Sequence, residues 1–492
     1  MSETSNSSNL SELPPSLVWS HFATLCAIPR PSYREEALKR HLAAWADARG
    51  IAHFEDTAGN LILHKPASPG CESAPGVILQ GHLDMVCQAN AGTVHDFERD
   101  AIQTVLRDGW VVAENTTLGA DNGIGVALAL AALEAEGIAH PALEVLLTIN
   151  EESGMDGARG LAPGTLQGKS LINLDTEEWG HFYLGCAGGV DVEVRHISEM
   201  EALPPDYAVL RFDVSGLRGG HSGIDIHLGR GNAIKLLAEA LRDLAAHTDV
   251  RLIEMQGGSA RNAIPREAFA ICAVPLAAVS GIDEWVEHRL TSWQHRFADV
   301  DAGVTFRYEL DEMPVGQAVT VAERDRLLGF LDNAVNGVSR ISDDFAGVTD
   351  TSSNLGVFKL AQGESKVTFK VRSLLDARAD VLADKLVSFA SGYGLRAYKD
   401  GAYPGWTPDP DSALLALCQQ VYAAQFGAPA SLQVIHAGLE CGLLAASHPH
   451  LDMISFGPDI RGAHAPGERV EVESVERCWD LLQAVLQALA RA

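Results

Sequence analysis

The first 186 residues alternate between segments with helical spacing of apolar residues and short, continuous apolar runs. Apolar positions every three to four residues predict helices at 17–28, 33–50 and 119–137. Short apolar runs predict strands at 76–81, 142–150 and 170–175. Because strands separated by helices favour parallel pairing, this part predicts an α/β fold with a mixed, largely parallel sheet flanked by helices.

The pattern changes between about residues 187 and 399. Apolar and polar residues alternate there in stretches such as "RFDV" and "TFKV", which is typical of antiparallel sheets with one face in water. A strand–helix–strand–strand order occurs and is followed by a second, weaker copy. The segment predicts an inserted α+β domain, either internally duplicated or built from two unrelated stretches.

The α/β pattern returns after about residue 400, with helical spacing at 411–427 and 472–492. The simplest organisation is one α/β domain interrupted by the insert. We therefore expect three segments, 1–186, 187–399 and 400–492, of which the first and last form one domain.

Composition and charge narrow the class of protein. The 492 residues are 47% hydrophobic and carry a formal net charge of −28, which disfavours nucleic acid and anionic membranes as partners. The eight cysteines form no CxxC pair, and the N-terminal stretch lacks the apolar core of a secretory signal. No apolar run reaches the roughly 18 residues that a membrane span needs. We expect a cytoplasmic protein with reduced thiols.

Acids and imidazoles follow several of the predicted strands or open a predicted helix. They are His82, Asp84, Asp121, Glu151, Glu152, Asp175 and His464. In open α/β sheets ligands bind outside the carboxyl ends of the strands, so these side chains should converge. Without a cation they would repel one another strongly, which makes a metal the simplest explanation.

The ligand types indicate which metals are involved. Histidine and carboxylate ligands without thiolates suit zinc, cobalt or manganese better than calcium. Two histidines and three acids exceed the need of one tetrahedral ion but suit two ions that share a carboxylate. Asp121, at a helix start, is a reasonable bridge because the helix dipole favours its ionised form.

Four stretches resemble the metal-binding blocks of the co-catalytic zinc dipeptidase, aminoacylase and carboxypeptidase family: "QGHLDMV", "TLGADNGIGVA", "TINEESGMDGARGL" and "LINLDTEE". Others resemble its aminoacyl-histidine dipeptidase (peptidase D) branch, among them "GLRGGHSGIDIHLGRGNA", "GGSARNAIPRE", "KVRSLLDA", "IHAGLECGLL" and "SFGPDIRGAHAPGERV". The similarity runs from about residue 17 to the C-terminus.

The resemblance implies a role for each residue of the metal-binding blocks. His82 and Asp175 would bind one ion and Glu152 and His464 the other. Asp121 would bridge the two ions and precede a cis peptide bond. Asp84 would orient His82, and Glu151 would be the general base.

The resemblance also assigns roles in the insert, which would act as a lid. His221 would hydrogen-bond the developing oxyanion. Asn262 and Arg372 would bind the carboxylate at the C-terminus of the substrate. Outside the insert, His436 is a weaker candidate for a substrate contact.

The function implied is hydrolysis of dipeptides, favouring Xaa-His, by two divalent ions, with zinc first and cobalt or manganese as substitutes. A homodimer is expected on family grounds. The alternatives are an amidohydrolase for N-acyl amino acids with the same machinery, and a binding protein that has lost the chemistry.

Overall fold

The computed structural model describes residues 10–311 and 316–491, and they divide into two compact units. Unit 1 comprises Met1–Gly185, Trp406–Val434 and Leu439–Ala492, and unit 2 comprises Cys186–Gly405 with Ile435–Gly438. Part of the N-terminal stretch in which no signal was expected, residues 1–9, lies outside the described residues. No described helix has the length and apolar character that a membrane span requires.

Unit 1 contains an eight-stranded sheet in the order β1-β2-β6-β3-β7-β23-β8-β22. In that order the strands span Ala52–Glu55, Leu61–Lys65, Leu143–Thr148, Val77–His82, Ser170–Asn173, Asp452–Ser455, His181–Cys186 and Ser431–Ile435. The four central strands β6, β3, β7 and β23 run parallel, whereas β1, β2 and β8 pair antiparallel. The prediction of a mixed, largely parallel sheet is therefore confirmed.

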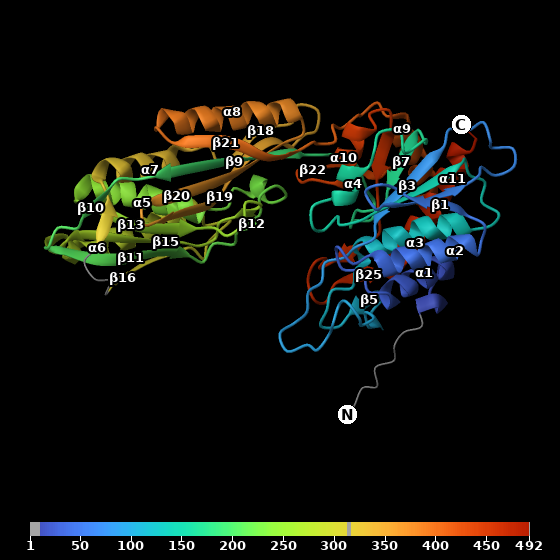
Figure 1. The fold of residues 1–492 in the computed structure, drawn as a ribbon, viewed down its shortest axis with the longest axis horizontal. Helices are drawn as coiled ribbons and strands as arrows, with labels where there is room; N and C mark the ends of the chain where they lie inside the picture. The colour runs from blue at the N-terminus through green and yellow to red at the C-terminus, as the bar shows by residue number, and fades with distance from the viewer. Residues whose placement is uncertain (1–9, 312–315, 492) are drawn as a thin grey trace. The chain divides into compact units, whose positions relative to one another are not determined.

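Seven helices of unit 1 accompany this sheet among the described residues (Figure 1). They are α1 Ser16–Ala27, α2 Glu36–Asp47, α3 Ala120–Glu134, α4 Asp156–Gly160, α9 Ala413–Phe426, α10 Glu440–Ser447 and α11 Val472–Leu489. A small sheet that the sequence pattern did not reveal has the order β24-β25-β5-β4, formed by Ile460–Arg461, Arg469–Glu471, Trp110–Ala113 and Thr104–Arg107. It joins the segment before α3 to the segment that carries His464.

Helix α3 differs from its prediction at both ends. It ends at Glu134 rather than near Gly137, and Asp121 and Asn122 have non-helical backbone angles within its first turn. The peptide bond between them is cis. The helix is buried along almost its whole length because it packs against α1 and β3.

Unit 2 is built on a nine-stranded sheet whose described pairings are all antiparallel. Its path is β16-β11-β15-β13-β19-β20-β9-β21, and β18 pairs with β19. In that order, with β18 last, the strands span Thr305–Leu310, Tyr207–Ser215, Ala268–Pro275, Arg251–Gly257, Thr349–Ala361, Glu364–Ser373, Gly188–Ile197, Arg396–Tyr403 and Gly337–Ile341. Two short pairs, β10 Met200–Ala202 with β17 Gln317–Val319 and β12 Gly220–His221 with β14 Ala263–Ile264, complete the strands.

Among the described residues of unit 2, four α-helices pack on the strands of this sheet, α5 Ala233–His247, α6 Ile282–Arg296, α7 Val321–Asn333 and α8 Asp376–Gly392. Local sequence fixes where two of them begin. The side chain of Asn232 caps α5, and Thr320 caps α7 three residues before Glu323, a spacing typical of a capping box.

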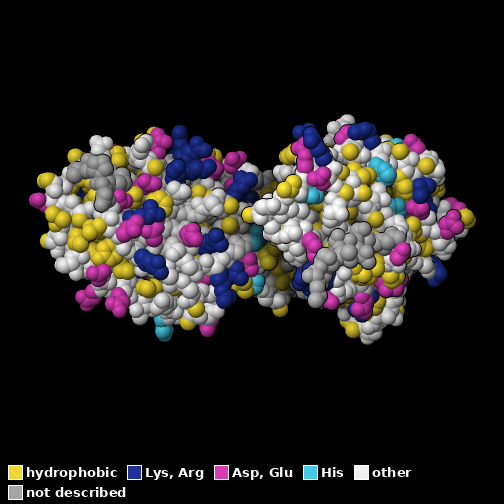
Figure 2. Space-filling model, turned by 90° about the horizontal axis from the view of Figure 1, so that it is seen from below, with side chains coloured by type: hydrophobic (Ala, Val, Ile, Leu, Met, Phe, Trp, Pro, Cys, Tyr) yellow, Lys and Arg dark blue, Asp and Glu magenta, His cyan; other side chains and the backbone are white. Residues whose placement is uncertain are grey.

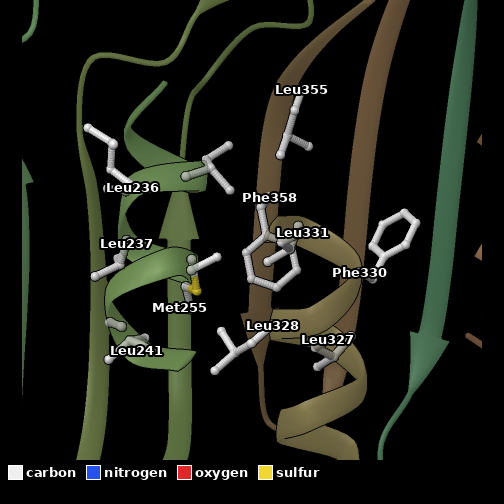
Figure 3. Close-up of a cluster of buried hydrophobic side chains, with 14 of the residues drawn as sticks. Leu236, Leu237, Leu241, Met255, Leu327, Leu328, Phe330, Leu331, Leu355 and Phe358 are labelled. Carbon is white, nitrogen blue, oxygen red and sulfur yellow. The ribbon is translucent and has the colours of Figure 1, made fainter. Parts of the chain in front are cut away.

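The core of unit 2 lies between these helices and one face of the sheet. Leucines of α5 and α7 belong to the same buried cluster as Met255, Leu355 and Phe358 on the strands (Figure 3). Burying one such leucine or phenylalanine contributes about 1.5–3 kcal/mol. On β9 the residues Val190, Val192 and Val194 face this core, so the residues between them face away from the helices.

Candidate metal centre

The predicted metal ligands of unit 1 lie at the carboxyl ends of its parallel strands. His82 is the last residue of β3, while Glu151 and Glu152 follow β6, which ends at Thr148. Asp175 follows β7, which ends at Asn173. Because β6, β3 and β7 are parallel neighbours, their carboxyl ends bring these side chains to one edge of the sheet.

Three groups of these side chains place their potential ligand atoms within 4.8 Å of one another. The first group is His82, Asp121 and Asp175, and the second is Asp121, Glu152 and His464. The third is His82, Glu151 and Glu152. The first two groups share Asp121, which is the arrangement that two ions with one common carboxylate would require.

The two oxygens of Asp121 contact different histidines. His82 Nε2 lies 3.1 Å from Asp121 Oδ1 and 3.3 Å from Asp175 Oδ1. His464 Nε2 lies 3.0 Å from Asp121 Oδ2 and 3.1 Å from Glu152 Oε1. Each half of the Asp121 carboxylate therefore belongs to one of the two groups.

The pKa values of these residues show how strongly the acids crowd one another. Burial would lower the pKa of His82, but Asp175, Asp121 and Asp84 raise it well above its usual value. The carboxylates of Asp121 and Glu152 raise the pKa of His464 to about 11. Burial raises the pKa values of Asp175 and Glu177 to about 7, against the opposing effects of His82 on Asp175 and of His464 on Glu177. The acids of this cluster thus favour positive charge among them.

Two atoms test whether this pocket suits metal ions. Glu152 Oε1 and Asp175 Oδ1 are buried, and each lies near an imidazole nitrogen, His464 Nε2 at 3.1 Å and His82 Nε2 at 3.3 Å, without the geometry of a hydrogen bond to any described residue. A buried carboxylate oxygen that accepts no hydrogen bond is costly. Both atoms belong to groups that combine imidazole nitrogens with carboxylate oxygens, the donors that zinc, cobalt and manganese bind. The residues therefore fit a pair of divalent ions.

Asp84 is fully buried and is not a member of any of the three groups of potential ligand atoms. It contacts residues that are members. Its carboxylate accepts hydrogen bonds from the backbone N–H groups of Glu151, at 2.9 Å, and Glu152, at 3.1 Å. Its Oδ1 lies 3.4 Å from His82 Nδ1, although that nitrogen is nearer, at 3.1 Å, to the backbone carbonyl oxygen of Asp84. Asp84 thus fixes the turn that carries both glutamates as well as the imidazole ring.

Glu468 and Arg30 support the turn before Asp121, and the sequence interpretation did not include them. Glu468 is buried, and its carboxylate accepts hydrogen bonds of 2.8–3.2 Å from the four consecutive N–H groups of residues 118–121. Arg30 donates to the carbonyl oxygens of Leu83, Asp84 and Gly119. The only sequence signal for Glu468 was its place four residues after His464 in "HAPGE".

Glu440 is a further buried carboxyl group that the sequence interpretation missed. Its Oε2 accepts hydrogen bonds from Gln80 Nε2 at 2.6 Å and Thr148 Oγ1 at 2.7 Å, and these residues lie on β3 and β6. Burial raises the pKa of Glu440 to about 7. The hydrogen bonds join the two strands that deliver His82 and the glutamate pair.

Unit 2 brings three of its predicted residues together around Arg372. This side chain is 4% exposed, and no carboxylate among the described residues lies within ion-pair distance of it. Its guanidinium contacts Tyr403 Oη at 2.5 Å, Ser222 Oγ at 3.4 Å and His221 Nε2 at 3.4 Å. Gly223 brings His436 close, because a Cβ at Gly223 would lie 1.9 Å from the His436 carbonyl oxygen.

The two histidines of this cluster have lowered pKa values. Burial and the positive charge of Arg372 lower the pKa of His221 to about 4 and that of His436 to about 3. His436 Nε2 contacts Ser352 Oγ at 2.7 Å, and its Nδ1 has no hydrogen-bond partner among the described residues. Both rings are therefore neutral at neutral pH.

Asn262 lies next to this cluster through the backbone. Its carbonyl oxygen accepts a hydrogen bond from Ser222 N at 2.8 Å, and the pairing of β12 with β14 sets His221 opposite Ala263. The Asn262 side chain is exposed. A cavity of about 630 Å³ on another part of the sheet, lined by residues such as Arg211, Gln256 and Phe269, contains none of the predicted site residues.

Residues 78–488 match the model of peptidase family M20/M25/M40, and the chain belongs to this family. It is 43% identical, over 98% of its length and 99% of the relative's, to the cytosol non-specific dipeptidase of Escherichia coli. The crystal structure of aminoacylhistidine dipeptidase from Vibrio alginolyticus is 42% identical, covers 98% of each chain and superposes with a TM-score of 0.88. Aminopeptidase PepT of Bacillus cereus, 17% identical over 97% of this chain and 99% of its own, shares the fold with a TM-score of 0.59.

These comparisons confirm the family resemblance that the sequence motifs indicated. They also confirm the fold class, a mostly parallel sheet with helices and a separate antiparallel sheet.

Proposed function

We propose that the protein is a cytosolic dipeptidase that uses two divalent metal ions and favours Xaa-His dipeptides. The observation that carries the proposal is the pair of ligand groups that share Asp121. The names of the two relatives that match over nearly their full lengths, a cytosol non-specific dipeptidase and an aminoacylhistidine dipeptidase, support the substrate class.

His82 and Asp175 would hold one ion, Glu152 and His464 the other, and Asp121 would bind both. We expect zinc, with cobalt or manganese as substitutes, because the donors are imidazole and carboxylate. Two such ions lower the pKa of water and polarise a peptide carbonyl. The buried oxygens of Glu152 and Asp175 that lack a hydrogen bond to any described residue support this assignment.

Glu151 would act as the general base that takes a proton from the attacking water and returns it to the leaving amine. Its carboxyl lies in the cluster with His82 and Glu152, yet it belongs to neither group that contains Asp121. Burial raises the pKa of Glu151 well above its usual value, and Asp175 and Glu440 add to the rise against the opposing effect of His82. A raised pKa suits a carboxylate that must accept a proton near neutral pH.

Asp84 would set the geometry of this step. Its carboxylate accepts hydrogen bonds from the N–H groups of Glu151 and Glu152 and so fixes the turn between them. In this turn the side chain of Glu151 would face the attacking water and that of Glu152 would bind a metal ion. Exchanging the two roles would require this turn to be rebuilt.

Arg372 and Asn262 would bind the substrate's C-terminal carboxylate, and His221 would donate to the developing oxyanion. The support is that Arg372 is buried without a carboxylate partner among the described residues. A guanidinium binds a carboxylate in a bidentate geometry, which selects short peptides with a free C-terminus. His221 is neutral and therefore able to donate one N–H to an anionic oxygen. His436 would line the same site.

A panel of substrates tests the proposal. Alanyl-histidine, other dipeptides and N-acetyl amino acids are incubated with protein loaded with zinc or cobalt. We expect rapid hydrolysis of dipeptides, with alanyl-histidine among the best. Preferred hydrolysis of N-acetyl amino acids would instead identify an amidohydrolase, and no hydrolysis by fully loaded protein would indicate a binding protein. Size-exclusion chromatography with light scattering tests the expected homodimer.

A further inference from the structure

Glu177 is an acid near the metal-ligand groups to which the proposed mechanism gives no role. It follows Asp175 by two residues, and its side chain is partly buried. Among the described residues its carboxylate has no ion-pair or hydrogen-bond partner, although it interacts electrostatically with Asp121 and His464. It is therefore an unpaired carboxylate beside the proposed catalytic centre.

The backbone holds Glu177 in a defined position. Its carbonyl oxygen accepts a hydrogen bond from Ile460 N at 3.0 Å, in the short strand that precedes the His464 loop. Thr176 is buried, whereas the side chains on either side of it, Asp175 and Glu177, are partly exposed. This alternation indicates an extended backbone, on which residues two apart face the same side. Glu177 thus faces the side on which Asp175 contacts His82.

The next residue shows what an ordinary surface acid looks like at this place. Glu178 is exposed, with 49% of its side-chain surface in solvent, and it contacts Tyr183 Oη and His181. Both of its partners lie on the neighbouring strand β8. The two adjacent glutamates therefore differ in burial and in partners, and of the two only Glu178 is paired with another described residue.

We propose that Glu177 binds the α-ammonium group of the substrate and so makes a free N-terminus a requirement for hydrolysis. The inference rests on the proposed dipeptidase function. The other carboxylates of this region have tasks under the proposed function or partners in the protein. Asp121, Glu152 and Asp175 would bind metal ions, and Glu151 would transfer protons. The carboxylates of Asp84, Glu440 and Glu468 accept hydrogen bonds from other residues. Glu177 is the acid in this part of unit 1 that is left to pair with a cation of the substrate.

This assignment explains how the site distinguishes a dipeptide from an N-acyl amino acid. Both substrates carry an amide bond and a C-terminal carboxylate, so the metal ions and Arg372 bind them alike. Only the dipeptide has an ammonium group next to the carbonyl that is attacked. An N-acylated substrate would leave the Glu177 carboxylate desolvated without a partner, and that cost rejects the substrate more strongly than a missing contact would.

The test compares alanyl-histidine with propionyl-histidine, which differ only in the ammonium group. For the zinc-loaded wild type we expect kcat/KM to be at least 10- to 100-fold higher for alanyl-histidine, the range of a charge-assisted hydrogen bond. In Glu177→Gln this preference should shrink by about 10- to 100-fold, mainly through slower hydrolysis of alanyl-histidine. Glu178→Gln is the matched control and should keep the wild-type ratio.

A second variant and the metal content separate recognition from a structural role. Glu177→Asp, which keeps the charge on a shorter side chain, should recover part of the preference, and all variants should retain the wild-type zinc content by atomic absorption. If Glu177→Gln kept the wild-type ratio of the two substrates, or lost zinc and slowed equally on both, the inference would be overturned. A wild type that hydrolyses no dipeptide would instead overturn the proposed function itself.

Discussion

The two units place histidines in opposite electrostatic settings. In unit 1, carboxylates surround His82 and His464, and their pKa values rise. In unit 2, His221 and His436 lie near Arg372, and their pKa values fall to about 4 and 3. The same side chain is therefore suited to bind a cation in one unit and to remain a neutral hydrogen-bonding group in the other.

The clusters also differ in what each lacks. In the unit 1 cluster, two buried carboxylate oxygens form no hydrogen bond with any described residue. In the unit 2 cluster, the buried guanidinium of Arg372 has no carboxylate partner among the described residues. Cations would complete the first and an anion would complete the second. This difference in charge belongs to the two clusters. The face of the molecule in Figure 2 shows no such separation, because basic and acidic side chains lie side by side on it. Each prediction below changes one side of this contrast.

The largest effect is expected from Asp121→Asn, which removes the carboxylate shared by both ligand groups. An amide offers one neutral oxygen in place of two charged ones, so both ions should bind more weakly and hydrolysis should fall below detection. Metal content by atomic absorption and dipeptide hydrolysis measure the change. Asp156→Asn, at an exposed acid of α4, should leave both unchanged. An Asp121→Asn protein with full metal content and activity would remove the basis for a shared ligand.

Glu151→Gln tests the chemistry without removing a ligand of either Asp121 group. The amide cannot accept the proton of the attacking water, and kcat should fall by about 100- to 10,000-fold. Metal content and the thermal midpoint should stay close to those of the wild type. Unchanged turnover in a metal-loaded sample would show that Glu151 is not the general base.

Arg372→Met tests the cationic cluster of unit 2. Loss of the charged fork should raise KM for alanyl-histidine by about 10- to 100-fold, since a charge-assisted hydrogen bond contributes about 1.5–3 kcal/mol. Arg396→Met is the control, because Arg396 is exposed on β21. Steady-state kinetics with a dipeptide amide would sharpen the result. Because this substrate has no C-terminal carboxylate, its KM should change little in Arg372→Met. An equal loss on both substrates would argue against a carboxylate contact.

The smallest expected effect concerns pH. The pKa of His436 is lowered to about 3, against about 6.5 in the unfolded chain, so the unfolded state binds the proton more readily between these values. Stability from this residue is therefore complete above pH 6.5 and declines as the pH falls toward 3. In His436→Gln the urea midpoint should decline less between pH 7.5 and pH 5 than in the wild type. Parallel declines in the two proteins would contradict the lowered pKa.

The fold of unit 1 could be predicted from the sequence because its signals are local. Apolar runs such as 76–81 and helical spacing such as 472–492 appear at β3 and α11, within a few residues of the predicted ends. The small sheet β24-β25-β5-β4 was not predicted, because its strands are two to four residues long and the pairing of β25 with β5 joins segments more than 350 positions apart.

The candidate ligands could be predicted for a related reason, since each follows a recognisable strand or opens a helix. The residues that support them could not. Arg30 and Glu468 form hydrogen bonds with the backbone carbonyl and N–H groups of Gly119. Every residue has such backbone groups, so the pattern of side chains along the sequence does not reveal these contacts. Glu440 supports the ends of β3 and β6 from the first turn of α10, a contact across 360 positions from Gln80. Only the folded chain brings such partners together.

The most direct test of the account is the number of metal ions bound to each chain. The protein is stripped with a chelator and titrated with zinc while bound metal and thermal midpoint are followed. We predict two zinc ions per chain and a midpoint that rises with zinc, because the ions replace the protons that otherwise balance the carboxylates. A stoichiometry of two that falls in Asp121→Asn would support the shared carboxylate. Binding of no zinc, or of one ion that Asp121→Asn leaves in place, would contradict it.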